Sequence, residues 1–138
     1  MFSGIVRLVA AIALVTSLAS SLPAFAGADD GVVKLKSVYP MSDTIERLKQ
    51  DIAGKGLMFF AAIDQSKLAA DAGIALNPST LLIFGNPALG TQFITANPNA
   101  GLDWPVRLLV SQDANGGVWV AYTDFNWIAE RHGISIRN

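Results

Sequence analysis

The chain has 138 residues, one histidine, no cysteine and a formal net charge of −1 at pH 7. Without cysteine it forms no disulfide and no thiolate metal site, and its scattered basic residues argue against nucleic acid as a partner. We expect one domain of a size that folds without metals, and we predict no cofactor and no metal.

The first 26 residues have the layout of a secretory signal peptide. Arg7 is their only charge, residues 8–18 are apolar, and Ala24-Phe25-Ala26 matches an A-x-A cleavage site. We therefore predict that residues 1–26 are removed and that the mature chain is a single domain over residues 27–138, periplasmic or secreted.

The alternative for this segment is an uncleaved membrane anchor. The uncharged run after Arg7 is close to the shortest length that spans a bilayer. Pro23 and the small residues around it favour cleavage. We accordingly expect the mature chain to begin at Gly27 and to have no attachment to the membrane.

The chain after the signal segment opens with a strand and a helix. Val32 to Tyr39 alternates apolar and polar residues, which is typical of a half-buried strand. A helix is expected to start near Met41, with Asp43 as its N-cap and Glu46 completing a capping-box-like pair. Gly54 is expected to end this helix.

The middle of the chain contains two apolar strands, each followed by a helix. The uninterrupted apolar run Leu57 to Ile63 predicts a central strand, and Asp64 then caps a short helix from Ser66 to Ala72. The strand from Thr80 to Phe84 is followed by Asn86-Pro87, a strong helix start with asparagine at the N-cap and proline at the first helical position.

The last third of the chain predicts a loop, a hairpin and a final helix. Residues 97–101 are expected to be a loop, and Pro105 to Gln112 a strand. Residues 113–117 form a hairpin turn, because Asn-Gly tolerates positive φ, and Val118 to Thr123 is the partner strand. Asp124 caps the last helix. This order predicts a two-layer α+β domain with a mainly antiparallel sheet and helices packed on one face.

Two segments, Ile83-Phe84-Gly85-Asn86-Pro87 and Pro105-Val106-Arg107, resemble the domain of unknown function 302 family. The resemblance extends over about Val32 to Ile134 and includes the weaker mark Arg131-His132-Gly133. It implies a β-α-β-β-β-β-α arrangement, similar to one half of the saddle of TATA-binding protein, and a tendency to dimerise. Gln65 stands where family members often have histidine, so any metal or proton-transfer role of that histidine is not expected here.

The segment Gly85 to Thr91 has the glycine spacing of a phosphate loop but lacks its lysine, so a nucleotide site is not expected. Two interpretations remain open. Either the amides of Ala88, Leu89 and Gly90 are free at a helix N-terminus and hold an anion, or Asn86 satisfies them in a simple strand-to-helix turn.

Arg107 lies inside an apolar strand, on the same side as Leu109 and Ser111. Because burial of an unpaired guanidinium is unfavourable, it needs a partner or water, and Asp64 and Asp103 are the candidates. Such a pair either stabilises the fold or forms a clamp for a ligand carboxylate.

The single histidine and the tryptophans are given structural roles. His132 lies in the last turn of a helix, where the helix dipole favours a cation. Trp119 and Trp127 are assigned to the core. Trp104, in a loop before proline, is the best candidate for an exposed aromatic side chain.

Polar residues at strand ends and turns, where pockets form, define the predicted site for a small anionic ligand: Asp64, Gln65, Asn86, Asp103, Arg107 and Tyr122. We expect a non-catalytic homodimer that binds a ligand or a partner. The alternatives are an enzyme that uses Asp64 or Asp103 as a base beside Arg107, and an interaction module without a pocket. Convergence of Asp64, Asn86 and Arg107 around a cavity would favour a site.

Overall fold

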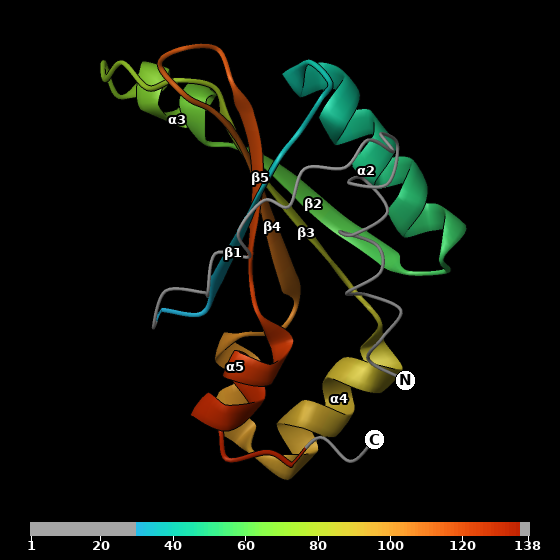
Figure 1. Cartoon of the computed structure of the whole chain (residues 1–138). Helices are drawn as coiled ribbons and strands as arrows, with labels where there is room; N and C mark the ends of the chain where they lie inside the picture. Colours follow the sequence, from blue (N-terminus) through green and yellow to red (C-terminus); the bar gives the residue numbers. More distant parts are fainter. Residues whose placement is uncertain (1–29, 136–138) are drawn as a thin grey trace, which may run out of the picture.

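A computed structural model of the chain describes residues 30–135. The predicted signal segment and the predicted first mature residue, Gly27, lie outside the described residues. Within them, five strands form one antiparallel sheet in the order β1-β5-β4-β3-β2, which confirms the predicted α+β class (Figure 1). The strands are β1 (Val32–Lys36), β2 (Met58–Asp64), β3 (Ser79–Gly85), β4 (Val106–Gln112) and β5 (Val118–Thr123). The prediction of a central strand for the apolar run Leu57 to Ile63 is wrong, because β2 lies at the edge of the sheet and much of its surface is exposed.

One helix, α2 (Met41–Gly54), covers one face of this sheet and carries the chain from one edge strand to the other (Figure 1). Leu48 and Ile52 of α2 are fully buried against the sheet. Burial of aliphatic side chains is the main favourable contribution to folding, at about 25 cal/mol per Å² of apolar surface. The strands add the rest of this core: Leu82, Phe84, Leu108, Val110, Val118 and Val120.

The helix α2 begins at Met41, as predicted, but its N-cap differs from the sequence prediction. The N-cap is Pro40 rather than Asp43, which lies in the first turn. Thr44 explains the shift, because its side chain is buried and its Oγ1 donates to the carbonyl of Pro40 at 2.9 Å and lies 2.7 Å from Ser37 Oγ. The helix therefore begins where a buried hydroxyl can be satisfied by the preceding turn.

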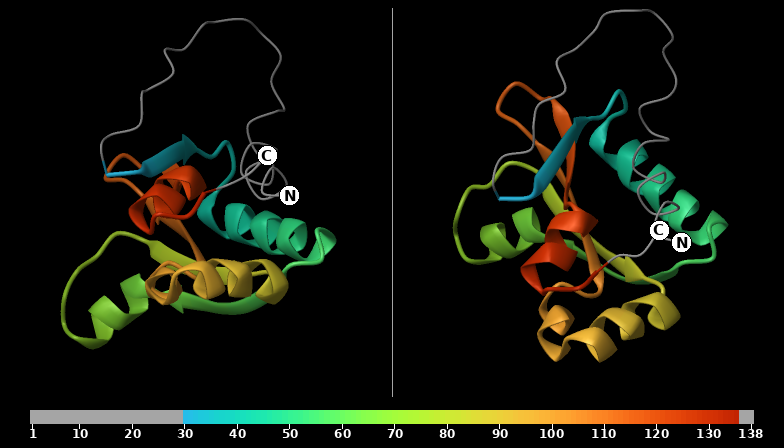
Figure 2. Two further views of the ribbon diagram at one scale, coloured as in Figure 1. Left: turned by 90° about the horizontal axis from the view of Figure 1, so that it is seen from below. Right: turned by 60° about the horizontal axis from the view of Figure 1, so that its bottom comes forward.

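The remaining helices lie at the two ends of the sheet, as Figures 1 and 2 show. The short helix α3 (Gln65–Asp71) lies at one end. At the other end are α4 (Pro87–Ala96), the 3₁₀ helix η2 (Pro98–Leu102) and α5 (Phe125–Arg131). The predicted loop over residues 97–101 is thus mostly helical, because Asn97 accepts a bond from the Asn99 amide at 3.0 Å and starts a turn.

Three N-caps predicted from the sequence are confirmed. The side chains of Asp64, Asn86 and Asp124 accept hydrogen bonds from backbone amides at the starts of α3, α4 and α5. The predicted hairpin between β4 and β5 is confirmed as well, with Gly116 at φ +82° in its turn. Each of these signals depends on local backbone chemistry, which explains why the sequence was sufficient.

The second face of the sheet is more open. Residues that alternate with the core positions are half-buried or exposed, among them Leu81, Leu109 and Trp119. Trp119 and Trp127 are therefore half-buried and not core residues as predicted. The ammonium groups of Lys34 and Lys36 lie over the Trp119 ring, 4.8 and 5.7 Å from its centroid. A broad, partly apolar sheet surface is left on this side.

Residues 65–78 form a projecting arm at the end of the sheet that lies away from α4 and α5 (Figure 1). None of the α3 residues, all of which the structure describes, is buried, and residues 71–78 after them are exposed. Leu68, Ile74 and Leu76 are more than half exposed. Among residues 30–135, no helix combines the length and the apolar character needed to cross a membrane.

Candidate functional site

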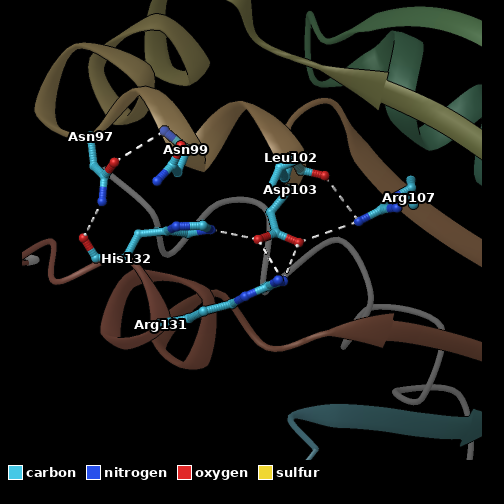
Figure 3. Close-up of polar contacts among 7 residues, drawn as sticks. All are labelled: Asn97, Asn99, Leu102, Asp103, Arg107, Arg131 and His132. Atoms are coloured by element: carbon cyan, nitrogen blue, oxygen red, sulfur yellow. Dashed lines mark hydrogen bonds and ion pairs between the residues drawn. The ribbon is translucent and has the colours of Figure 1, made fainter.

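The densest polar cluster surrounds Asp103, at the end of the sheet where α4, η2 and α5 meet (Figure 3). His132 Nε2 lies 2.6 Å from Asp103 Oδ2, and Arg131 Nη1 lies 3.0 Å from the same oxygen. Arg107 Nη2 lies 3.3 Å from Oδ1. One carboxylate thus holds two guanidiniums and an imidazole.

Local structure brings these four side chains together from three elements. Asp103 is the C-cap of η2, and its amide donates to the Ala100 carbonyl at 3.0 Å. Asn97, which caps η2, donates through Nδ2 to the carbonyl of His132 at 2.9 Å and so joins the start of η2 to the end of α5. The position of Asp103 relative to α5 is therefore fixed by hydrogen bonds at both ends of η2.

Burial within the cluster is unequal. The side chains of Asp103 and His132 are each 6% exposed, whereas those of Arg107 and Arg131 are 51% and 46% exposed. With a neutral imidazole, one carboxylate and two guanidiniums leave one net positive charge. Arg107 Nη2 and Arg131 Nη1 each lie 3.3 Å from Asp103 Oδ1, so these two nitrogens are at most twice that distance apart. The cluster presents a fixed pair of cations to solvent.

A small apolar cavity of about 40 Å³ adjoins the cluster. Asp103 borders both, and Asn86 is the other polar side chain that lines the cavity. The remaining lining residues come from α4, η2, α5 and the start of β4: Leu89, Gly90, Phe93, Ala100, Trp104, Val106, Phe125 and Ile128. Apolar walls beside charged groups are the usual composition of a small-ligand site.

Trp104 forms one wall of this cavity instead of being the exposed aromatic that the sequence suggested. Its ring packs against Phe60 in an edge-on arrangement, with centroids 6.0 Å apart. It also lies directly on Gly90, where an added Cβ would be 2.0 Å from Trp104 Nε1, and on Gly85, where that distance would be 3.0 Å. Both glycines therefore allow the close approach of the indole.

Three of the six predicted site residues lie at this end of the molecule. Asp103 and Arg107 form the predicted pair, and Asn86 lines the adjoining cavity. Asn86 Oδ1 accepts from the amides of Ala88 and Leu89 at 3.0 and 3.3 Å. The idea of free helix amides is therefore wrong, and the simple strand-to-helix turn is confirmed.

Two predicted residues, Asp64 and Gln65, lie near the opposite end of β3. Asp64 pairs with Thr80, whereas Arg107 pairs with Ile83, about 10 Å further along the strand direction. Asp64 also accepts from Ser66 Oγ at 2.7 Å, a bond that lowers the pKa of its carboxyl together with the Lys67 amide bond. Gln65 Oε1 accepts from Ser79 Oγ at 2.7 Å and fixes α3 to β3.

The last predicted residue, Tyr122, belongs to the packing of the core. It lies on β5 opposite Leu108 and packs against the buried cluster under α2. Its ring lies 6.3 Å from that of Phe125. Burial raises the pKa of the Tyr122 hydroxyl, and the nearby Asp124 carboxylate adds to the shift.

Sequence reasoning missed two members of the cluster, Arg131 and His132. They lie 28 and 29 residues after Asp103, so no local spacing connects them. The signal that could have found them was the Arg131-His132-Gly133 mark at the end of the last helix, where two basic side chains follow an apolar stripe. His132 was expected only to complement the helix dipole.

Comparison with known proteins identifies the family. Residues 33–137 match the family described as domain of unknown function DUF302. A protein named fluoride-specific ion channel FluC 1, from Brucella suis biovar 1 (strain 1330), is 36% identical over 108 residues, which are 78% of this chain and 42% of that protein. Fluoride-specific ion channel FluC 2 of Brucella melitensis biotype 1 (strain ATCC 23456 / CCUG 17765 / NCTC 10094 / 16M) is also 36% identical, with 40% of its length matched. The chain therefore spans about two-fifths of these relatives.

A solved structure shows the same fold. The crystal structure of an uncharacterized conserved DUF302 protein from Bacillus stearothermophilus aligns with a TM-score of 0.69, covering 75% of this chain and 80% of the other. The two sequences are 19% identical in this comparison, so the likeness concerns the fold alone.

Proposed function

The chain belongs to the DUF302 family, and we propose that its domain binds a small ligand through an anionic group, without catalysis. The observation that carries this proposal is the pair of half-exposed guanidiniums, Arg107 and Arg131, held by the buried carboxylate of Asp103. Guanidiniums fixed in advance lose little conformational entropy when they bind an anion.

The charge balance of the cluster supports the same proposal. Asp103 would repel an anion by itself, but it is 6% exposed and both of its oxygens already accept bonds from cationic groups. The exposed part of the cluster consists of the two arginines. An approaching carboxylate or phosphate therefore meets guanidinium donors first, and bonds of this charge-assisted kind are about twice as strong as neutral ones.

The two candidate carboxylates, Asp64 and Asp103, are poorly suited to act as a general base. A general base near neutral pH needs a carboxyl whose pKa is raised. Hydrogen bonds from Ser66 and from the Lys67 amide lower the pKa of Asp64, which weakens it as a base. Asp103 has its oxygens engaged by His132, Arg131 and Arg107.

Isothermal titration calorimetry and NMR titration with acetate, phosphate and fluoride test the proposal; fluoride is included because of the names of the two relatives. We expect Arg107→Gln and Arg131→Gln each to weaken binding of the preferred anion by about tenfold or more, because each removes a charge-assisted hydrogen bond. Arg47→Gln is the matched control, since Arg47 lies on α2, 3.9 Å over the Tyr39 ring. Equal losses in all three variants, or no binding of any anion, would contradict the proposal.

A homodimer is the second part of the proposal, supported by the open sheet face and the arm. A second copy of the chain covers the exposed side chains of Leu68 and Ile74, which are 59% and 62% exposed. Exposed apolar groups gathered in one region are typical of an interface. Sedimentation velocity should show a dimer for the unmodified protein and for Leu102→Ser, and a monomer for the double variant Leu68→Ser/Ile74→Ser. Leu102, 69% exposed at the other end of the molecule, is the control. A wild-type monomer at all concentrations would refute this part.

We also propose that the protein is exported and cleaved before Gly27. The support is the arrangement of Arg7, the apolar residues 8–18 and the Ala24-Phe25-Ala26 site. Intact-mass measurement of the exported protein should give a chain that starts at Gly27. Retention of residues 1–26 in the exported protein would contradict cleavage.

A further inference from the structure

The geometry points to a more specific ligand class: a small aliphatic monocarboxylate whose carbon chain enters the apolar cavity while its carboxylate binds Arg107 and Arg131. This inference rests on the proposed function and names the ligand class for the same site. Four observations support it: the cavity adjoins the arginines, its lining is apolar, its volume is small, and the Asp103 cluster has a net positive charge.

The cavity and the arginine pair share a boundary. Asp103 lines the cavity and contacts both arginines. Ile128 also lines the cavity, and Arg131 lies three residues further along α5. Residues three apart on a helix are surface neighbours. A ligand that is charged at one end and apolar at the other therefore spans both parts.

The lining of the cavity selects the chemistry of the ligand's tail. Leu89, Phe93, Phe125 and Ile128 provide aliphatic and aromatic walls. A hydroxylated or charged tail would lose its hydrogen bonds to water there without replacing them, which is unfavourable. Transfer of a hydrocarbon tail from water into the cavity is favourable. The Trp104 ring, which contacts Phe60 and Gly90, provides a rigid wall for it.

The volume of the cavity limits the length of the tail. Its 40 Å³ is about three times the smallest volume, on the order of 10–15 Å³, that holds one water molecule. About three or four carbon atoms fill such a space. Each buried methylene strengthens binding by about fourfold, the equivalent of about 0.8 kcal/mol.

The charge of the cluster selects a monoanion. Arg107 and Arg131 together exceed the charge of Asp103 by one when the imidazole is neutral. The guanidiniums already hold a carboxylate, that of Asp103, at 3.0 to 3.3 Å. A second carboxylate from solvent matches this donor arrangement and leaves the site neutral.

Calorimetric titration of the protein with acetate, propionate, isobutyrate, isovalerate and hexanoate tests the inference. We expect affinity to rise by about fourfold per carbon up to isovalerate and then to stop rising. Ala100→Val reduces the free space, since Ala100 is buried in the cavity wall, and should flatten this dependence on chain length. Ala70→Val, on the exposed α3, is the matched control and should keep the wild-type dependence.

A second variant keeps the test decisive if Ala100→Val does not fold. Ile128→Val enlarges the cavity by one methylene and should shift the best chain length to one carbon longer. Acetate binding that depends on Arg107 and Arg131 but does not improve with chain length would overturn the inference and leave the proposed function standing. Absence of binding for the whole series would overturn both.

Discussion

Gly90→Ala isolates the contact between α4 and Trp104. Gly90 lies inside α4, where alanine is intrinsically more favourable than glycine by about 1 kcal/mol. The new Cβ, however, would lie 2.0 Å from Trp104 Nε1 and 2.1 Å from Cε2, far inside van der Waals contact. The indole is a rigid plane that also packs on Phe60, so it has to be displaced as a whole.

The expected size of the effect follows from these opposing contributions. Overpacking of a well-filled region costs about 1–3 kcal/mol, and part of the burial of Trp104 is lost as well. After the gain in helix propensity, we expect Gly90→Ala to lower the free energy of unfolding by about 1–2 kcal/mol. For a domain of this length that corresponds to a fall in Tm of roughly 4–9 °C.

Urea unfolding and the NMR signal of the Trp104 indole N–H measure the two consequences separately. Gly54→Ala is the matched control, because it also lies in a helix and its added Cβ would meet nothing within 4 Å. We expect that control to be neutral or stabilising by up to about 1 kcal/mol. A Gly90→Ala protein as stable as Gly54→Ala, with an unmoved Trp104 signal, would refute the reasoning.

Three further predictions concern the cluster, the hairpin and the core. Asp103→Asn should lower the free energy of unfolding by about 2 kcal/mol in urea titrations, because a buried charged acceptor is lost. Asp71→Asn is the control: it removes only an exposed ion pair with Lys67 and should change the free energy of unfolding by less than about 0.5 kcal/mol. Hydrogen bonds from the Trp119 indole and from nearby amides lower the pKa of the Asp113 carboxyl. The stability that the ionised Asp113 contributes is therefore present above the ordinary pKa of 3.8 and is lost as the pH falls below it. Chemical shifts of Trp119, followed from pH 6 to about pH 2, should report this loss. Leu48→Ala should destabilise by about 2–5 kcal/mol in urea titrations, because Leu48 is 0% exposed in the core.

Each of these predictions has its own contradicting result. Asp103 and Asp71 variants of equal stability would show that the cluster contributes nothing. An Asp113→Asn variant should lack the acid transition in the Trp119 signal, and an unchanged transition would assign it to another group. A small effect of Leu48→Ala would mean that α2 does not depend on this contact with the sheet.

Sequence reasoning was most successful where structure depends on neighbouring residues. Asn86 followed by Pro87, and Asp124 before an apolar stripe, define helix starts through bonds that span two or three residues. The hairpin with Gly116 at positive φ is equally local. The N-cap of α2 was misjudged, although its start at Met41 was not, because Thr44 pairs with Ser37 across a turn and this contact outweighs the capping preference of Asp43.

The candidate site was harder to predict because it depends on which strand ends face each other. Asp103 and Arg107 are near in sequence, and their pairing could be anticipated. Asp64 also follows a strand, but that strand, β2, is exposed and runs antiparallel to β3, so Asp64 lies away from Asn86. Arg131 joins the cluster only through the packing of α5 beside η2, which no spacing in the sequence encodes.

The candidate site is assembled mainly from the helices at one end of the sheet, whereas the hydrophobic core is assembled from strands and α2. The cavity and the Asp103 cluster lie between Asn86 and His132, mainly in α4, η2 and α5. The ladders of β3, β4 and β5 keep their register through core positions such as Leu82 and Leu108. Sequence changes in those helices can consequently alter the lining of the cavity while the sheet keeps its register, so a shared sheet does not by itself imply a shared site.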